Sequence, residues 1–265
     1  VKQLQYTLDQ ALIKEAMEAP ADNARLYVAA YSVKSQVSLF SQRAKSQQCT
    51  AYGVGGDFFR FHNYELISGS YLMENSIAND QVVIDEEAAW KIFGAIEVDG
   101  MTLTYNGKEY IVQGVVKPQD GYKAKAGGAE SGTVFFPLEA IGQDADCYEI
   151  IFPNPVSGFA LKRVKEAFTS CGYSEDDIRV IDNSERYSFV NSAKRVLKWT
   201  DKGMAFKALK YPYWENSAIA VENIVDLLTF FRIIFIIPPI AIVIISVICF
   251  HPIHRLKLLI LRIVE

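Results

Sequence analysis

The sequence contains few of the residues on which catalytic and metal-binding sites depend. Its 265 residues include three histidines and four cysteines, and no two cysteines form a C-x-x-C pair. The motifs of phosphate-binding loops, serine hydrolases and zinc proteases (G-x-x-x-x-G-K-S/T, G-x-S-x-G and H-E-x-x-H) are absent. We therefore expect no catalytic residue, no metal site and no cofactor, and a membrane-anchored enzyme is the weakest functional hypothesis.

An excess of positive charge is also lacking. Lysine and arginine total 27 against 31 aspartates and glutamates, which gives a formal net charge of −4. No basic stripe with interleaved aromatic residues is present, although nucleic-acid binding depends on such a surface. Nucleic acid is therefore not an expected partner.

What the sequence does have is a long apolar run near its C-terminal end. Ile233 to Phe250 contains no charged residue. At about 1.5 Å rise per residue, this run spans roughly 27 Å, close to the ~30 Å hydrocarbon core of a bilayer. Apolar residues extend it upstream past Arg232, whose charge can reach the interface. We predict a transmembrane helix over 227–250; a buried helix of a soluble protein is the alternative.

The charges on either side of this helix predict its orientation. Arg255, Lys257 and Arg262 follow the run, and basic flanks stay in the cytoplasm. We therefore place residues 251–265 in the cytoplasm and residues 1 to about 225 outside the cell membrane. The start at Val1 and the apolar end of the chain suggest a fragment of a longer membrane protein with an earlier membrane segment. A cleaved signal peptide would also explain Val1.

Of the four cysteines, Cys249 lies in the apolar run. The other three are expected on an oxidising side of the membrane, where one disulfide is allowed. We predict a bond between Cys147 and Cys171, which leaves Cys49 unpaired.

The first third of the chain gives mixed secondary-structure signals. A helix is predicted over Lys2–Glu18 and a strand over Arg25–Lys34, whereas Ser35–Thr50 has no clear period. Two turns are predicted, one at the glycine cluster of Gly53, Gly55 and Gly56 and one at 66–70. Between them, Asp57 is expected to cap a short aromatic segment, Phe58–Phe61.

The middle of the chain is more informative. Gln81–Ile84 reads as a strand, Asp85 as the N-cap of a following helix, and Gly94 as its C-terminal cap. Asn106-Gly107 predicts a type I′ turn between two strands within 99–117. Gly114 predicts a bulge or a close backbone approach.

The next segment, Pro118–Gly132, is predicted to be a long loop. Tyr122, Lys123 and Lys125 within it are candidate contacts with a partner, although a solvated linker is the blander reading. After a strand at Thr133–Phe136, a β-α-β unit is predicted from a strand at 148–152, a helix at 156–171 and a strand at 178–181. A helical stalk interrupted by Pro212 then leads into the membrane run.

Three consecutive features carry a family resemblance. A glycine and aromatic entry ends in a turn at Gly69. The segment V-V-I-D-E-E-A-A-W-K-I-F-G follows at Val82–Gly94, and it includes Asp85 and Phe93. V-D-G-M-T-L-T-Y-N-G-K-E-Y-I-V-Q-G-V-V then occupies Val98–Val116. This order resembles the extracytoplasmic core domain of MacB/FtsX-type ABC transporter permeases.

The resemblance implies an α+β, two-lobed extracytoplasmic domain, with a β-α-β lobe and an inserted β-rich lobe, on stalk helices. It implies an N-terminal stalk helix at 1–20, a core domain at 21–183 with the inserted lobe at about 55–132, and a C-terminal stalk helix at 184–226. The implied signature residues are structural: Gly69, Asp85, Phe93, Gly94, Asn106, Gly107 and Gly114.

The resemblance also implies a function. A permease subunit would pair with a second permease and with a separate ABC ATPase subunit, and ATP hydrolysis would move an extracytoplasmic domain that handles a peptide, lipid or protein partner. Pro238 and Pro239 within the membrane run are expected to form a hinge, because proline lacks the backbone N–H that a helix uses. The alternative is the extracellular sensor domain of a membrane signalling receptor.

Overall fold

The computed structural model describes residues 1–15, 25–41, 46–73, 79–174, 176–198 and 212–264, with side chains described up to residue 249. Its chain forms two compact units, Val1–Ile181 and Asp182–Glu265. Each unit has its own elements and is treated separately below.

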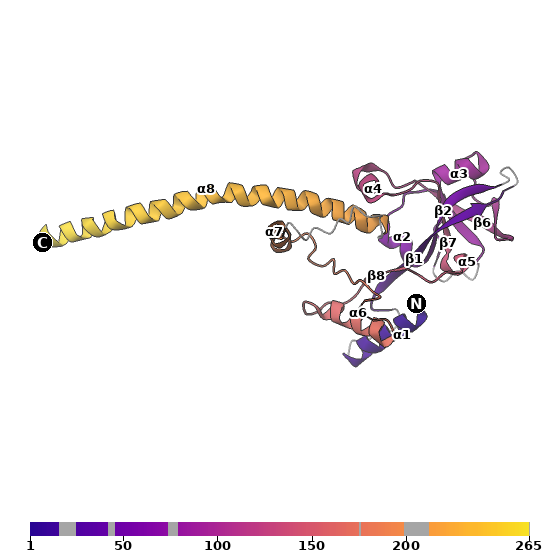
Figure 1. Cartoon of the computed structure of the whole chain (residues 1–265), viewed down its shortest axis with the longest axis horizontal. Coiled ribbons are helices and arrows are strands. Elements are labelled where there is room, and N and C mark those ends of the chain that lie inside the picture. The colour runs from indigo at the N-terminus through magenta and orange to yellow at the C-terminus, as the bar shows by residue number, and fades with distance from the viewer. Residues whose placement is uncertain (16–24, 42–45, 74–78, 175, 199–211, 265) are drawn as a thin grey trace. The chain divides into compact units, whose positions relative to one another are not determined.

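One mixed sheet organises the first unit (Figure 1). Its strands are β1 (Val28–Leu39), β2 (Gln47–Gly56), β3 (Leu66–Gly69), β4 (Gln81–Asp85), β5 (Thr102–Tyr105), β6 (Lys108–Val116), β7 (Thr133–Pro137) and β8 (Cys147–Ile151). The order is β3-β6-β4-β7-β2-β1-β8, and β5 pairs with β6. The pairs β2–β7 and β4–β6 are parallel, and the other pairs are antiparallel. The predicted α+β class is confirmed.

The described residues of this unit form the helices α1 (Lys2–Lys14), α2 (Phe58–Phe61), α3 (Glu86–Phe93), α4 (Gly121–Gly127), α5 (Leu138–Ile141) and α6 (Phe159–Ser170). In α1, Leu4, Leu8 and Leu12 recur every four residues and form one buried face. This face packs with Val164 and Ala167 of α6, and the two helices lie side by side in Figure 1.

A second hydrophobic core lies around α3. It joins α3 to side chains of β1, β2, β4, β5, β6 and β7, with Ile84, Ile92, Leu103 and Phe136 almost fully buried. Strands from within the predicted insertion at 55–132 therefore share a sheet and a core with strands outside it.

The turn predicted at the glycine cluster is wrong. Gly53 and Gly55 lie within β2, which pairs with β1 over its whole length. A side chain at Gly55 would meet the ring of Tyr31 at 2.1 Å, so glycine is needed to let that ring cover the strand. The chain turns only at Gly56, where φ is +64°. The Ser35–Thr50 segment, which has no clear period, supplies the end of β1 from Ser35 and the start of β2 up to Thr50.

Residues 66–70 were also wrongly predicted as a turn. Leu66–Gly69 is strand β3, which pairs antiparallel with β6.

Pro118–Gly132, predicted to be a long loop, contains the short helix α4. Gly128 ends this helix in the left-handed conformation.

The predicted β-α-β unit is incomplete. β8 and α6 form, although α6 begins three residues later than expected, after Gly158 with φ +82°. Ile178–Ile181 is not a strand. Val180 instead packs against the core that α1 and α6 form with β1 and β8, whereas Ile181 is exposed. Helix α1 ends at Lys14, earlier than the predicted Glu18, and residues 16–18 lie outside the described part.

The predicted disulfide is wrong. Cys147 begins β8 opposite Ser32, whereas Cys171 ends α6 with its sulfur 3.9 Å from Thr7 Oγ1, and no bond joins the two cysteines. Cys49 is buried in the sheet, and burial raises the pKa of its thiol to about 11.

In the part of the second unit that the structure describes, the helices are α7 (Phe189–Leu197) and α8 (Tyr213–Val264). Ser188 caps α7 by accepting a hydrogen bond from the Asn191 backbone N–H. Pro212 directly precedes α8, as expected for a residue that lacks the backbone N–H and whose ring clashes with a preceding helical turn. From there α8 runs without interruption through Pro238 and Pro239.

Candidate functional site

Asp85 is the most buried of the predicted signature side chains. Its Oδ1 accepts the Ala88 backbone N–H at 2.7 Å, which confirms the predicted N-cap. Its Oδ2 accepts the Thr133 backbone N–H at 2.8 Å. Burial raises the pKa of this carboxyl, and the two backbone N–H groups act in the opposite direction. One side chain therefore fastens the start of α3 to the start of β7.

The turn residues behave as the sequence predicts. Gly94 ends α3 in the left-handed conformation with φ 71°. Asn106 and Gly107 both have positive φ, 47° and 77°, as a type I′ turn requires. Phe93 is partly buried and packs against the core around α3.

Gly69 and Gly114 are brought together by the β3–β6 pairing, which places them directly opposite each other. A Cβ at Gly69 would lie 2.1 Å from the Gln113 carbonyl oxygen, and one at Gly114 would lie 2.4 Å from the Ser70 carbonyl oxygen. A register shift in the β4–β6 pairing also falls between Val112 and Gly114. The close backbone approach predicted at Gly114 is confirmed, and its partner is the other predicted glycine.

The candidate partner-contact residues lie on α4. Tyr122 is 65% exposed, and Lys123 and Lys125 are also exposed. The end of this segment is tied to the sheet through Glu130, whose carboxylate accepts from Lys34 Nζ at 2.6 Å and from Thr50 Oγ1 at 2.5 Å. Helix α4 is thus attached to the sheet by the hydrogen bonds of Glu130, and it exposes one aromatic and two basic side chains to solvent.

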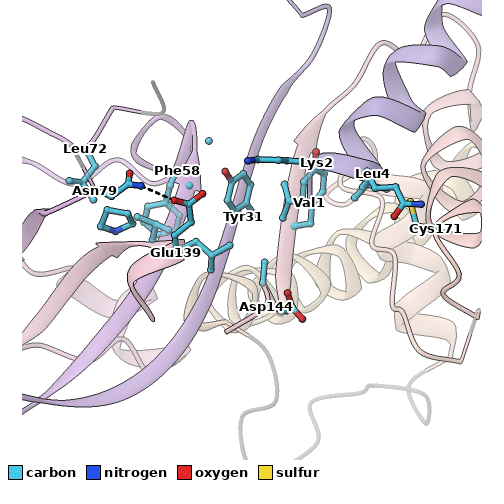
Figure 2. Close-up of a pocket in the computed structure, with 18 of the residues that line it drawn as sticks. Val1, Lys2, Leu4, Tyr31, Phe58, Leu72, Asn79, Glu139, Asp144 and Cys171 are labelled. Atoms are coloured by element: carbon cyan, nitrogen blue, oxygen red, sulfur yellow. Dashed lines mark hydrogen bonds between the residues drawn. The ribbon is translucent and has the colours of Figure 1, made fainter. Parts of the chain in front are cut away.

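A cleft of about 570 Å³ opens in the same unit (Figure 2). Asn79, Glu139 and Phe58 stand at one end of it, Leu4 and Cys171 at the other, and Tyr31 lies between them. Asn79 donates a hydrogen bond to Glu139 at 2.8 Å. Aromatic and aliphatic side chains make up much of the lining, so the cleft can accept an apolar group and orient it with a few polar ones.

One wall of the cleft is braced by a buried histidine. His62, which the sequence shows only as a lone histidine in an aromatic segment, lies with Nε2 2.7 Å from Glu149 Oε2 on β8. Its ring also lies 4.4 Å from the ring of Phe58. This pair links α2 to β8.

Across the described residues, no group of three or more histidine, cysteine, aspartate or glutamate side chains could hold a metal ion.

In the second unit, an ion-pair network joins the α7 segment to α8. Arg186 makes a two-point contact with Glu215, with both N–O distances 2.7 Å, and its Nε lies 3.1 Å from Glu222. Arg195 contacts both oxygens of Asp226, at 3.1 and 3.2 Å from its Nε. The side chains of Arg186 and Asp226 are only 7% and 2% exposed. The network holds together residues that are up to 36 positions apart in the chain.

Beyond this network, α8 changes character. Among the described residues, it is the one helix long and apolar enough to cross a membrane, and its most apolar 18-residue window is 0% buried. In a water-soluble fold such a helix would be the core of the structure, whereas here its apolar side chains face outward.

Comparison with known proteins connects this geometry to a family. Residues 4–167 match the family described as MacB-like periplasmic core domain, and this match covers more than half of the chain. The chain belongs to the MacB-like periplasmic core domain family. The resemblance read from the motifs at Val82–Gly94 and Val98–Val116 is thereby confirmed.

Two solved structures are also similar to this chain. The periplasmic region of MacB from Actinobacillus actinomycetemcomitans is 21% identical, with a TM-score of 0.50, and the match covers 73% of this chain and 82% of that chain. The extracellular domain of the ABC-type transporter YknZ from Gram-positive bacteria is 13% identical, with a TM-score of 0.45, and the match covers 58% of this chain and 81% of that chain. No curated protein matches the chain.

The MacB-like family match ends before α7, so the ion-pair network lies outside it. Sequence reasoning missed this network because it read Glu215, Glu222 and Asp226 only as an acidic flank. It also missed the cleft and the pairing of His62 with Glu149, because their residues come from distant parts of the chain. For the network a signal was present, since two arginines precede three acidic residues spaced along one helix.

Proposed function

We propose that this chain is part of the permease subunit of a MacB/FtsX-type ABC transporter. The supporting observation is the succession, in one chain, of a MacB-like periplasmic core domain over 4–167 and a helix with an exposed apolar run long enough to cross a bilayer. Residues 1 to about 225 then lie outside the membrane, and 251–265 lie in the cytoplasm, as the basic flank predicts.

The proposed work of the subunit is mechanical. A separate ATPase subunit hydrolyses ATP, two permeases pair, and motion on the cytoplasmic side reaches the extracytoplasmic domain through the membrane helices. Helix α8 suits this role because it is one unbroken helix from Tyr213 to Val264, and the ion pairs with Arg186 and Arg195 fix α7 to its outer part.

Within this arrangement we keep the predicted divisions of the chain. Residues 1–20 and 184–226 flank a core at 21–183 with an inserted lobe at about 55–132, and 227–250 cross the membrane. Within 184–226, the outer part of α8 is the stalk, and α7 is docked on it. Pro238 and Pro239 form the hinge of the membrane segment. The absence of their N–H groups weakens the backbone hydrogen bonds of that turn and makes it the easiest place for α8 to bend.

We also propose that α4 contacts the extracytoplasmic partner, a peptide, lipid or protein. Support comes from the exposure of Tyr122, Lys123 and Lys125 together on a short helix that Glu130 ties to the sheet. Exposed aromatic side chains beside basic ones are common at binding surfaces.

The test begins with the full-length permease and the ATPase encoded next to it, purified together and reconstituted into liposomes. We expect a stable complex whose ATPase rate changes when the extracytoplasmic partner is added. Pro238→Ala with Pro239→Ala should preserve ATP hydrolysis and abolish the response to the partner. A permease that binds no ATPase, and is instead joined to a signalling domain, would overturn the proposal.

The α4 contact is tested separately with the same complex. Tyr122→Ala with Lys123→Glu should reduce the partner response and leave the basal ATPase rate unchanged. Lys165→Glu, a charge reversal at an exposed position of α6, is the matched control. An equal response in both variants would remove α4 from the contact surface.

A further inference from the structure

Helix α7 is oriented opposite to an ordinary amphipathic helix of a soluble protein. Its polar side faces its neighbour: Ser192 is fully buried, and Arg195 binds Asp226 of α8. Its apolar side faces outward, with Phe189, Val190 and Leu197 exposed by 44%, 59% and 83%. In water a helix buries its apolar side and exposes its polar side. The exposed apolar side of α7 therefore indicates contact with an apolar partner.

The contacts with α8 show where the apolar side of α7 points. Arg195 meets α8 at Asp226, whereas the Phe189 ring lies 4.8 Å from the guanidinium of Arg232. At 1.5 Å rise per residue, Arg232 lies about 9 Å further along α8 than Asp226, in the direction of the apolar run. At 100° per residue, Phe189 and Leu197 belong to the same side of α7. That side therefore faces along α8 toward the membrane-spanning run.

The two helices also cross at a steep angle. Figure 1 shows α7 end-on while α8 runs across the picture, and the ion pairs hold them in contact. If α8 stands across the bilayer, α7 lies nearly parallel to its plane.

The level at which α7 meets α8 coincides with the change from polar to apolar side chains. Glu215, Glu222 and Asp226 precede it, and exposed apolar residues follow from Leu227 onward. Arg186 and Arg195 offset two of these three carboxylate charges, which reduces the repulsion from anionic lipid headgroups. The exposed side chains of Lys194 and Lys198 add positive charge to α7.

We propose that α7 is an interfacial helix that lies in the outer leaflet of the bilayer beside α8. Its apolar side, with Phe189, Val190 and Leu197, inserts to the level of the upper acyl chains, and its polar side holds α8 through the ion pairs. Arg232, the single charge at the outer edge of the apolar run, is held at this level by the Phe189 ring. This inference rests on the proposed membrane crossing by α8.

The test uses photocrosslinking of the full-length permease in liposomes. The photoreactive amino acid p-benzoyl-phenylalanine is introduced singly at Val190 or Leu197 on the apolar side of α7, or at Asn191 on its opposite side. Ile244 in the apolar run of α8 is the control for membrane insertion. After irradiation, mass spectrometry measures the fraction of each variant that carries a covalent lipid adduct.

We expect lipid adducts at Val190 and Leu197 at a yield comparable to that at Ile244 and several-fold higher than that at Asn191. Adducts at Ile244 without any at Val190 or Leu197 would overturn the interfacial helix while the membrane crossing stands. Crosslinks from Val190 or Leu197 to protein in place of lipid would also overturn it, because another part of the protein would then cover the apolar side. A lack of adducts at Ile244 as well would refute the crossing on which both proposals depend.

Discussion

The contact between Arg186 and Glu215 should decide whether α7 stays docked on α8. Arg186→Ala removes the guanidinium that faces Glu215 and Glu222 and leaves both carboxylates without this partner in a largely buried setting. Removing one member of a buried ion pair costs about 3 to 5 kcal/mol. The local unfolding of α7 should become easier by that amount.

Hydrogen exchange measures this local opening directly. Since about 1.4 kcal/mol corresponds to a tenfold change in an equilibrium, amide exchange in Phe189–Leu197 should accelerate by roughly 100- to 4,000-fold. If the docking energy of α7 is smaller than the loss, exchange should reach the rate of an unprotected helix. Exchange in α3, which belongs to the other unit, should stay unchanged.

The matched control is Lys194→Ala, which removes an exposed cation from the same helix without touching the network. Its exchange rate should stay within about threefold of the parent protein, because exposed charges contribute little stability. The double variant Arg186→Ala with Glu215→Ala should cost less than the sum of the two single changes. Unchanged protection in Arg186→Ala would refute the reasoning that the ion pairs hold α7.

Three further predictions concern the first unit. Gly69→Ala should lower the unfolding free energy by about 2 to 5 kcal/mol, because the new side chain adds left-handed backbone strain and overlaps a backbone oxygen. Gly107→Ala adds the same strain in open space, so it should lower the unfolding free energy by about 1 to 2 kcal/mol. Thermal unfolding in detergent would compare them, and equal losses would contradict the close approach. Asp85→Asn should cost about 1 to 3 kcal/mol in the same assay, because one of its two N–H donors loses its acceptor; no loss would argue against the two-sided contact. Burial acts to raise the pKa of Glu130, but hydrogen bonds from Lys34 and Thr50 outweigh it and hold the pKa below its ordinary value. The stabilising contact is therefore complete above about pH 4.3 and is lost as the pH falls through the lower pKa that Glu130 has in the folded protein. Cleavage within 118–132 by an acid-active protease should accelerate in that pH range. Glu130→Gln should abolish this pH dependence.

Local patterns predicted the middle of the chain well because each signal there has one physical meaning. Asp85 precedes a helix whose first N–H groups need an acceptor, and Gly94 follows the last turn where a left-handed residue is required. Asn106-Gly107 satisfies the two positive φ values of a tight hairpin. The same local logic failed at Gly53 and Gly55, since glycine is needed there by side chains from distant residues: Ile141 and Val33 at Gly53, and the Tyr31 ring at Gly55.

The errors share a cause in long-range packing. Residues 66–70 look like a turn until β6 supplies a strand partner. Ile178–Ile181 looks like a strand, although no strand pairs with it and Val180 packs against the core around α1 and α6. The disulfide between Cys147 and Cys171 was compatible with the compartment, but the fold places one cysteine in the sheet and the other at a helix end.

By itself the sequence determined the α+β class, the family, the hairpin, the helix caps around α3 and the apolar length of the membrane run. Each depends on neighbouring residues or on a continuous stretch of the chain. Only the tertiary structure decided which distant groups meet: Asp85 with Thr133, Gly69 with Gly114, His62 with Glu149, and the two arginines with the carboxylates of α8. It also decided which way α7 faces, because an amphipathic pattern fixes the two sides of a helix but not the neighbour that each side contacts.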